Sequence, residues 1–459
     1  MTLQAVLDQI ETNMPAATDR LLELLRIPPV STDPAYAAHC DTAADWLVAD
    51  LESIGVTVSK RPTPGHPMVV GHVEGDGPHI LFYGHYDVQP VDPIELWERD
   101  PFDPAIEDTA KGPVIRGRGS SDDKGQLMTF VEACRAWKEV HGSLPCRITF
   151  FFEGEEESGS PSLIPFMKEN ADELTSDIAL ICDTGLFESR VPAIITMLRG
   201  LAGLEVEITG PDRDLHSGMY GGLVRNPLHV MSALIAGLHD ETGRVTLEGF
   251  YDDVPELSDD IRAQWQSLSF DHATFLSDIG LTEQGGEVDR TPLEKLWSRP
   301  TCEVNGLWGG YTGDGSKTVL PSKAHAKFTF RLVGQQDPAK IVAALKAYVE
   351  ASVPADYKVS YKGDKGAPAA QMSVSHPAFE QARKALSDEW PDAAAYVGCG
   401  GSIPIAGFFK DILGTDAMLI GFGKDDDQIH SPNEKYDVES FTKGIRSWAR
   451  ILDEMTRKA

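Results

Sequence analysis

The chain has 459 residues, more than one compact core usually accommodates, so we expect two domains of ordinary size. Its 71 acidic residues outnumber its 41 basic ones, and the formal net charge of -30 opposes binding to nucleic acid or to an anionic membrane. No apolar run approaches the length that spans a bilayer, and the N-terminal residues lack the basic-then-apolar order of a signal peptide. We therefore expect a soluble, cytoplasmic protein. The 6 cysteines form no CxxC pair, which argues against a disulfide framework and against a thiolate zinc site.

Helical and strand patterns alternate in the first part of the chain. Amphipathic helices are expected over residues 3–26 and from about 42 to 54. Apolar runs at 79–83, 147–152 and 178–182 indicate buried strands, and a further amphipathic helix is expected between the first two. This alternation predicts the α/β class, with a mostly parallel, doubly wound sheet. Ligands bind beyond the carboxyl ends of the strands in such sheets.

The pattern changes near residue 200. Residues 203–210 and 325–333 alternate like half-exposed strands, and helices are expected over 226–240 and near 338–350. These patterns predict an inserted α+β domain of ferredoxin-like type, within which residues 240–300 are acidic and give no clear pattern. The helix-strand alternation resumes from about residue 376. The expected domain borders are therefore 1–199 for the first part of the catalytic domain, 200–375 for the insert and 376–459 for the second part.

Several apolar or glycine-bounded stretches end in a potential metal ligand. These ligands are His85 in YGHYDVQP, Asp122 in GRGSSDDKG, Glu156 and Glu157 in FFFEGEEES, Asp183 in ALICDTG, and His430 in DDDQIHSPNE. An imidazole and several carboxylates at the tips of different strands can meet in space. So many anions would repel one another unless divalent cations neutralised them, and the recurrence therefore predicts a cation site.

Each of these residues also has an ordinary structural explanation. A histidine at a strand end is usually structural, and aspartates between a glycine-rich loop and a helix suit N-capping. We expect Asp123 to cap the helix and Asp122 to face the metals. Asp87 shares a face with His85 if the strand continues, and it can accept the second imidazole proton and fix the tautomer. Residues 425–427 have no such context and are expected to be surface charge.

The motifs GHYDVQP, GRGSSDDKG, EGEEESGS, CDTG, RDLHSG, KTVLP, FRLV, GGSIP and HSPNE, in this order, resemble the M20 family of metallopeptidases over nearly the whole chain. The resemblance is greatest to its dipeptidase branch of carnosinase-like and aminoacyl-dipeptidase enzymes. It implies two divalent ions. Imidazole and carboxylate ligands suit zinc, which is the first choice, and they also suit manganese or cobalt.

The resemblance also implies a role for each ligand. His85 and Asp183 would hold one ion, Glu157 and His430 the other, and Asp122 would bridge both. Glu156 would be the general base that takes a proton from the attacking water and passes it to the leaving amine. Asp87 would orient His85.

The insert would act as a lid and dimerisation domain, so the resemblance implies a homodimer. His216 would cross the dimer interface and stabilise the oxyanion of the neighbouring active site, although a capping or packing histidine is the ordinary alternative. Arg331 would bind the terminal carboxylate of the substrate, which suits a forked guanidinium. Gly401 and Ser402 would complete this anion site, and Thr318 would contact substrate from the partner subunit.

The expected function is di-metal-dependent hydrolysis of the amide bond of dipeptides or short peptides with a free C-terminal carboxylate. A metal-activated water would attack, with Glu156 as general base. The alternative is an N-acyl amino acid deacylase or desuccinylase, or a glutamate-type carboxypeptidase, using the same site. Asp183 favours a peptidase, because the matching residue of deacylases tends to be glutamate. A non-enzymatic scaffold would have to explain why Glu156 and the non-ligand His216 are both present.

Overall fold

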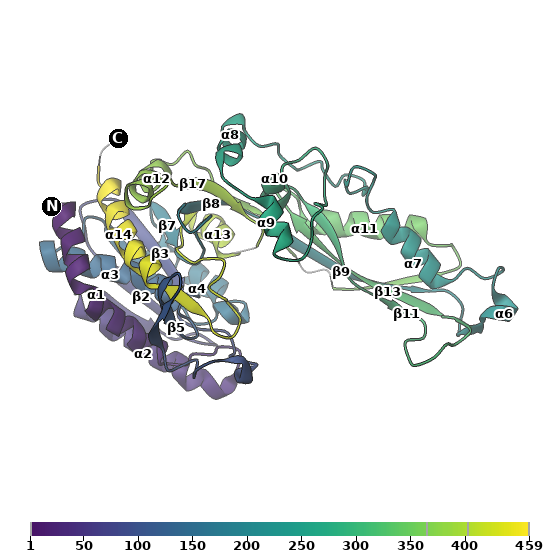
Figure 1. The fold of residues 1–459 in the computed structure, drawn as a ribbon, viewed down its shortest axis with the longest axis horizontal. Coiled ribbons are helices and arrows are strands. Elements are labelled where there is room, and N and C mark those ends of the chain that lie inside the picture. The colour runs from purple at the N-terminus through teal and green to yellow at the C-terminus, as the bar shows by residue number, and fades with distance from the viewer. Residues whose placement is uncertain (1, 364–365, 402–403, 458–459) are drawn as a thin grey trace. The chain divides into compact units, whose positions relative to one another are not determined.

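The computed structural model describes residues 2–363, 366–401 and 404–457, and its ribbon is shown in Figure 1. The chain forms two compact units. Unit 1 comprises Met1–Thr196, Met372–Val397 and Ile405–Ala459, and unit 2 comprises Met197–Gln371 and Gly398–Pro404. Each unit is built around its own sheet.

The main sheet of unit 1 has the strand order β1-β2-β6-β3-β7-β18-β8, continued by β16, with β17 also paired to β8. β3 pairs in parallel with β6 and β7, and β18 in parallel with β7, whereas the flanking pairs β1–β2, β2–β6 and β18–β8 are antiparallel. The predicted α/β class is confirmed, with the parallel order confined to the central strands. The strands are β1 (Thr57–Arg61), β2 (Met68–Val73), β3 (His79–His85), β6 (Arg147–Glu153), β7 (Ile178–Ile181), β8 (Ala193–Leu198), β16 (Ala370–Gln371), β17 (Ala395–Cys399) and β18 (Ala417–Leu419).

Helices cover this sheet. α3 packs on β3, α1 and α14 pack against α3, α12 packs on α14, and α2 covers β1 and β2. α3 ends at Gly142, whose φ of 72° is the left-handed conformation that glycine adopts without penalty. The helices of unit 1 are α1 (Leu3–Leu25), α2 (Ala37–Ser53), α3 (Lys124–His141), α4 (Leu163–Glu169), α5 (Ala171–Leu174), α12 (Pro377–Glu389), α13 (Pro404–Phe408) and α14 (Val438–Met455). A small antiparallel sheet of β4 (Ala105–Thr109), β5 (Gly112–Arg116) and β19 (Lys435–Asp437) completes the unit.

An aromatic cluster fixes the strands that lead to the carboxyl edge of the sheet. The rings of Phe82 on β3 and Phe130 on α3 stack with centroids 3.8 Å apart, and Trp448 on α14 meets both edge-on. On the opposite face, Phe151 of β6 packs against Tyr83 of β3. Because both faces are buried, the apolar runs are continuous rather than alternating. A slip of one residue between β3 and β6 would move these rings to the other face, so their packing fixes the register of the two strands.

Unit 2 contains an antiparallel sheet of order β11-β13-β9-β14, with β15 paired to β9. β9 alternates strictly between buried and half-buried residues, and α7 and α11 pack on the sheet. The chain order β9, α7, β11, β13, α11, β14 is the ferredoxin-like arrangement that was predicted. The elements are β9 (Gly200–Thr209), α7 (Pro227–Ala236), β11 (Thr301–Gly309), β13 (Lys323–Leu332), α11 (Pro338–Ser352), β14 (Lys358–Lys362) and β15 (Gly366–Ala367).

Residues 240–300 contain short helices and ion pairs in which the glutamate is buried. Arg299 lies 2.9 Å from Glu287, and Arg262 lies 2.6 Å from Glu294. Some of the acidic side chains of this segment are therefore paired with arginines of the same segment. These helices are α8 (Asp259–Ser267), α9 (His272–Ser277) and α10 (Pro292–Trp297); the remaining elements of unit 2 are β10 (Leu215–His216), α6 (Ser217–Tyr220) and β12 (Val319–Leu320).

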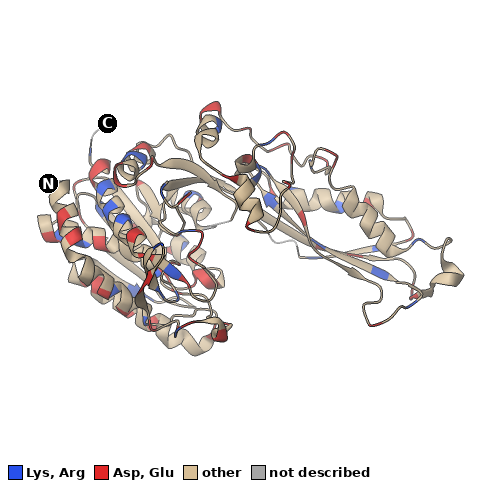
Figure 2. Ribbon diagram, in the orientation of Figure 1, with Lys and Arg blue, Asp and Glu red and all other residues tan. Residues whose placement is uncertain are grey.

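Acidic and basic residues are interspersed within both units (Figure 2). Among the described residues, no helix combines the length and the apolar content needed to cross a membrane.

Candidate metal centre

Two groups of side chains in unit 1 are each arranged to hold a metal ion, and they share one carboxylate. The first group is His85, Asp122 and Asp183, and the second is Asp122, Glu157 and His430. Within each group the ligand atoms lie within 4.8 Å of one another. The structure thus brings together the same five side chains that the sequence grouped, with Asp122 between the two sets.

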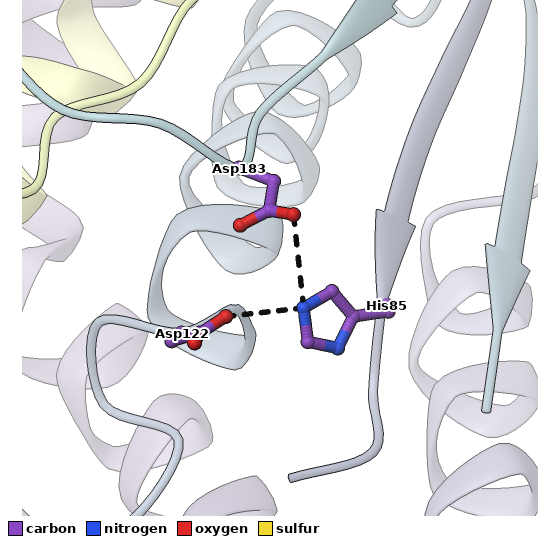
Figure 3. A group of neighbouring side chains, drawn as sticks. All are labelled: His85, Asp122 and Asp183. Carbon is purple, nitrogen blue, oxygen red and sulfur yellow. Dashed lines mark hydrogen bonds and ion pairs between the residues drawn. The ribbon is translucent and has the colours of Figure 1, made fainter. Parts of the chain in front are cut away.

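The Nε2 atom of His85 is the centre of the first group. It lies 3.1 Å from Oδ1 of Asp122 and 3.9 Å from Oδ2 of Asp183. Figure 3 shows both carboxylates directed at this one ring nitrogen. In the second group, Nε2 of His430 lies 2.8 Å from Oδ2 of Asp122 and 3.3 Å from Oε2 of Glu157. The two oxygens of Asp122 therefore face different imidazoles, as a bridging carboxylate requires.

The sheet topology explains why these residues meet. His85 is the last residue of β3, and Asp183 follows the end of the adjacent parallel strand β7. Glu157 lies in the 3₁₀ turn Glu156–Ser158, which follows β6 on the other side of β3. Asp122 lies in the loop that leads into α3, and His430 in the loop between β18 and β19. All the groups thus cluster beyond the carboxyl ends of parallel strands.

Asp87 contacts both His85 of the first ligand group and the turn that carries Glu157 of the second. Its Oδ1 atom lies 3.4 Å and its backbone oxygen 3.1 Å from Nδ1 of His85, which leaves Nε2 to face the ligand group. The same carboxylate accepts the backbone N–H groups of Glu156 at 3.2 Å and Glu157 at 3.1 Å. A fully buried Asp87 therefore orients the imidazole and also holds the glutamate turn.

The electrostatics fit a divalent cation. Burial, with the charges of Asp122 and neighbouring glutamates, raises the pKa of Asp183 well above its ordinary value. Burial disfavours the charged form of His85, but hydrogen bonds to Asp122 and Asp87 outweigh it and raise its pKa well above the usual value. Hydrogen bonds to Asp122 and Glu157 raise the pKa of His430 to about 10. Two imidazoles that retain their protons beside a carboxylate that resists ionisation mark an excess of negative charge, which a cation would neutralise.

Two aspartates differ from the sequence expectation. Asp123 does not cap α3 through its side chain; its Oδ2 atom accepts the backbone N–H of His85 at 3.0 Å, because the tight loop turns the carboxylate toward β3. Asp427 is not surface charge. It is fully buried, and its carboxylate accepts Ser121 Oγ at 2.7 Å and Lys435 Nζ at 2.7 Å.

Neighbours that sequence reasoning left without a role also support the glutamate turn. Nε2 of Gln89 donates to Oε2 of Glu157 at 2.6 Å. Glu155 is buried and accepts the backbone N–H groups of His66 and Ser162 at 3.0 and 3.1 Å. Gln89 belongs to the motif GHYDVQP, so the sequence contained a pattern that points to its place near the site. No sequence pattern pointed to the buried position of Glu155, because acidic runs usually lie in solvent.

The proposed oxyanion residue His216 lies in unit 2 and is exposed. Its Nδ1 atom accepts the backbone N–H of Gly218 at 3.0 Å and so caps α6. The backbone oxygen of Thr318 accepts Ser217 N–H at 3.0 Å, and His216 pairs with Val319. Unit 2 therefore brings His216 and Thr318 together.

The proposed carboxylate-binding residues also lie in unit 2. Arg331 is half-buried on β13. Burial and the charge of Arg331 lower the pKa of Arg199, whose Nε donates to the backbone oxygen of Gly400 at 3.1 Å. Gly401 is exposed and donates its N–H to Cys399 Sγ at 3.3 Å, and Ser402 lies outside the described residues. Arg199 lies outside the sequence motifs, because a lone arginine carries no pattern.

Comparisons with known proteins identify relatives of this chain. The model of peptidase family M20/M25/M40 matches residues 81–454. A Cys-Gly metallodipeptidase from Candida albicans is 30% identical, over 98% of this chain and 97% of the relative. The crystal structure of human carnosine dipeptidase 1 has a TM-score of 0.77 at 25% identity, with 99% of each chain covered. An M20 family metallo-carboxypeptidase from Sulfolobus solfataricus has a TM-score of 0.78 at 31% identity, covering 96% of this chain and 99% of that one.

The family match spans most of the chain and includes every residue of the two ligand groups. The resemblance seen in the sequence is thereby confirmed. The chain belongs to peptidase family M20/M25/M40.

Proposed function

We propose that this protein is a metallodipeptidase that hydrolyses the amide bond of dipeptides or short peptides with a free C-terminal carboxylate. The observation that carries the proposal is the pair of ligand groups joined by Asp122. Relatives named as a Cys-Gly metallodipeptidase and a carnosine dipeptidase support the substrate class.

Glu156 is the proposed general base. Two ions bound by the ligand groups would polarise the scissile carbonyl and lower the pKa of a water. Burial, with the charges of Glu157 and Asp87, raises the pKa of Glu156. A carboxylate with a raised pKa is a better acceptor for the proton of the attacking water, and it can then release that proton to the leaving amine. Asp87 holds Glu156 by its backbone N–H and keeps the base in place.

Unit 2 supplies the proposed substrate residues. Arg331 would bind the substrate carboxylate, with Gly401 and Ser402 completing the anion site, and His216 would stabilise the oxyanion. Thr318 would make a further contact to substrate. We propose residues 200–375 as the lid and dimerisation domain, and residues 1–199 and 376–459 as the catalytic domain.

A homodimer is part of the proposal. β11 is an edge strand of the unit 2 sheet, and its side chains Val304, Leu307 and Trp308 are exposed. An exposed apolar edge strand is a template for pairing with another chain, so a second copy would protect it.

We propose zinc as the metal, two ions per chain, with manganese or cobalt as alternatives, because imidazole and carboxylate ligands suit all three. A cytoplasmic location is proposed from the cysteines, all of which are free thiols. Free thiols are typical of a reducing compartment.

A second candidate function is a carboxypeptidase, or a deacylase or desuccinylase of N-acyl amino acids. The similarity to the M20 metallo-carboxypeptidase supports it, because the same metal centre serves any amide beside a carboxylate. Asp183 stands where deacylases tend to carry glutamate, and it favours the dipeptidase.

Metal-reconstituted protein, incubated with free-amine dipeptides and with their N-acetylated forms, distinguishes the two functions. The proposal predicts faster hydrolysis of the free-amine series. Preference for the N-acetylated series would support the alternative, and hydrolysis of neither by intact, metal-loaded protein would refute both.

A further inference from the structure

Glu434 is a fully buried carboxylate, four residues after His430, that has no role in the function proposed above. We propose that it is a positioning residue: it holds the segments that carry Asp122 and His430 at the spacing that the second ion requires. The second ion is the one assigned to Asp122, Glu157 and His430, so this inference rests on the two-ion function.

The carboxylate of Glu434 organises the loop that ends at Asp122. Its Oε1 atom accepts the backbone N–H groups of Ser121 at 2.9 Å and Asp122 at 3.1 Å. Its Oε2 atom accepts the backbone N–H of Gly119 at 3.0 Å and Nη1 of Arg118 at 2.8 Å. Hydrogen bonds to an ionised, buried acceptor are stronger than neutral ones. Both oxygens therefore fix the backbone from which the bridging carboxylate projects.

The same residue anchors the loop that carries His430. The backbone oxygen of Glu434 accepts the N–H of Gly117 at 3.0 Å. At the other end of the loop, Asp427 accepts Ser121 Oγ at 2.7 Å. The His430 loop is thus tied at both ends to residues 117–122.

The backbone of this loop needs such anchors. His430 has φ 61°, and Gln428 and Asn433 have φ 58° and 64°. Side-chain-bearing residues rarely adopt this left-handed conformation, and they persist in it only where the surroundings impose it. Contacts at the loop ends therefore decide where the imidazole of His430 points.

The effect should differ between the two ions. Two of the three ligands of the second ion, Asp122 and His430, lie on the segments that Glu434 ties together. The first ion takes only Asp122 from them, because His85 is the last residue of β3 and Asp183 follows β7, so both are held by the sheet. Loss of the Glu434 carboxylate should therefore lower the binding affinity for the second ion more than that for the first.

Glu434→Gln tests the inference with little change in volume. The amide keeps one acceptor oxygen and turns the other into an NH₂ group that faces N–H donors, so one pair of hydrogen bonds is lost. Glu389→Gln is the matched control: Glu389 is also a buried carboxylate of unit 1, and it binds Arg446 at 2.6 Å and Arg450 at 2.7 Å on α14. The control removes a buried ionic acceptor without touching the ligand loops.

Zinc titration calorimetry of the metal-free full chain, with thermal unfolding of each variant, gives the readout. In Glu434→Gln the second ion should bind about 10- to 100-fold more weakly and the first less than about threefold more weakly. The control should lose thermal stability and keep both affinities. Equal weakening of the two ions, or unchanged affinities with a lower Tm, would show a purely structural carboxylate and overturn the inference.

If Glu434→Gln does not fold, Asp427→Asn replaces it, because Asp427 ties the same two segments at the other end of the loop. The same selective loss is expected, and equal weakening again overturns the inference. The readout is independent of turnover. If Glu434→Gln loses the second ion selectively while metal-loaded wild type hydrolyses no dipeptide, this inference stands and the proposed function is refuted. If wild type hydrolyses dipeptides while the variant weakens the binding of both ions equally, the proposed function stands and this inference is refuted.

Discussion

Replacing Glu156 by glutamine should leave both ions bound and remove most turnover, because the amide cannot take a proton from water. The chain offers matched controls on either side. Glu155 and Glu157 precede and follow it, and the structure gives each of the three glutamates a different environment. Changing each glutamate in turn to glutamine therefore separates the loss of the general base from the loss of folding stability and from the loss of metal binding.

The magnitudes follow from these environments. Loss of a general base costs about 100- to 10,000-fold in kcat, equivalent to about 3–5 kcal/mol of transition-state stabilisation. Glu155→Gln leaves one acceptor oxygen for two N–H groups, that of Ser162, which is buried, and that of His66, which is half-buried. One of these donors then loses its partner, which costs about 1–3 kcal/mol of folding stability. Turnover per folded molecule should stay near the wild-type value.

Glu157→Gln should instead weaken metal binding, because Glu157 lies in the second ligand group. The assay measures three quantities on each variant: bound zinc by elemental analysis, the free energy of unfolding in urea, and kcat for one dipeptide at saturating metal.

Two results would refute the assignment. If Glu156→Gln lost an ion, its defect would be one of metal binding rather than of proton transfer. If Glu155→Gln, fully folded and metal-loaded, lost turnover as severely as Glu156→Gln, the base would have to be reassigned within the glutamate run.

Further predictions concern the second ion, the response to pH and the core. His430→Ala should reduce bound zinc from two ions to one, read by elemental analysis, and retention of two ions would remove His430 from the ligand set. Burial raises the pKa of Glu153 to about 8 from an ordinary 4.5, so its contribution to stability is full below pH 4.5 and is lost as the pH rises through 8. In urea unfolding, the free energy of unfolding of metal-free wild type should therefore fall relative to that of Glu153→Gln as the pH rises from 4.5 to 8. The same pH dependence in both proteins would contradict the raised pKa of Glu153. Phe82→Ala should cost about 3–5 kcal/mol, because Phe82 is fully buried against Phe130 and Trp448; a loss below about 1 kcal/mol in urea unfolding would contradict the packing account.

The strands that carry the candidate site could be predicted because they are buried on both faces. Runs predicted at 79–83 and 147–152 are the strands His79–His85 and Arg147–Glu153. The second helix begins at Ala37 rather than near residue 42. A capped 3₁₀ turn, in which Asp33 accepts the N–H of Ala35, leads into it, and such a start has no apolar periodicity to reveal it.

The supporting contacts of the site could not be predicted from the sequence. Glu434 bonds to Ser121 across 313 residues, and Asp427 bonds to the same serine across 306 residues. Local patterns show which residue types recur and where strands end, whereas these partners depend on how distant loops fold together. Asp427 was read as surface charge for this reason, and Asp123 as a cap.

Zinc titration of metal-free protein, with bound ions and dipeptide turnover measured on the same samples, tests the central claim most directly. The two-ion account predicts two ions per chain and turnover that rises with occupancy of the second. A folded protein that binds both ions and hydrolyses no free-amine dipeptide, or one that is fully active with a single ion, would contradict it.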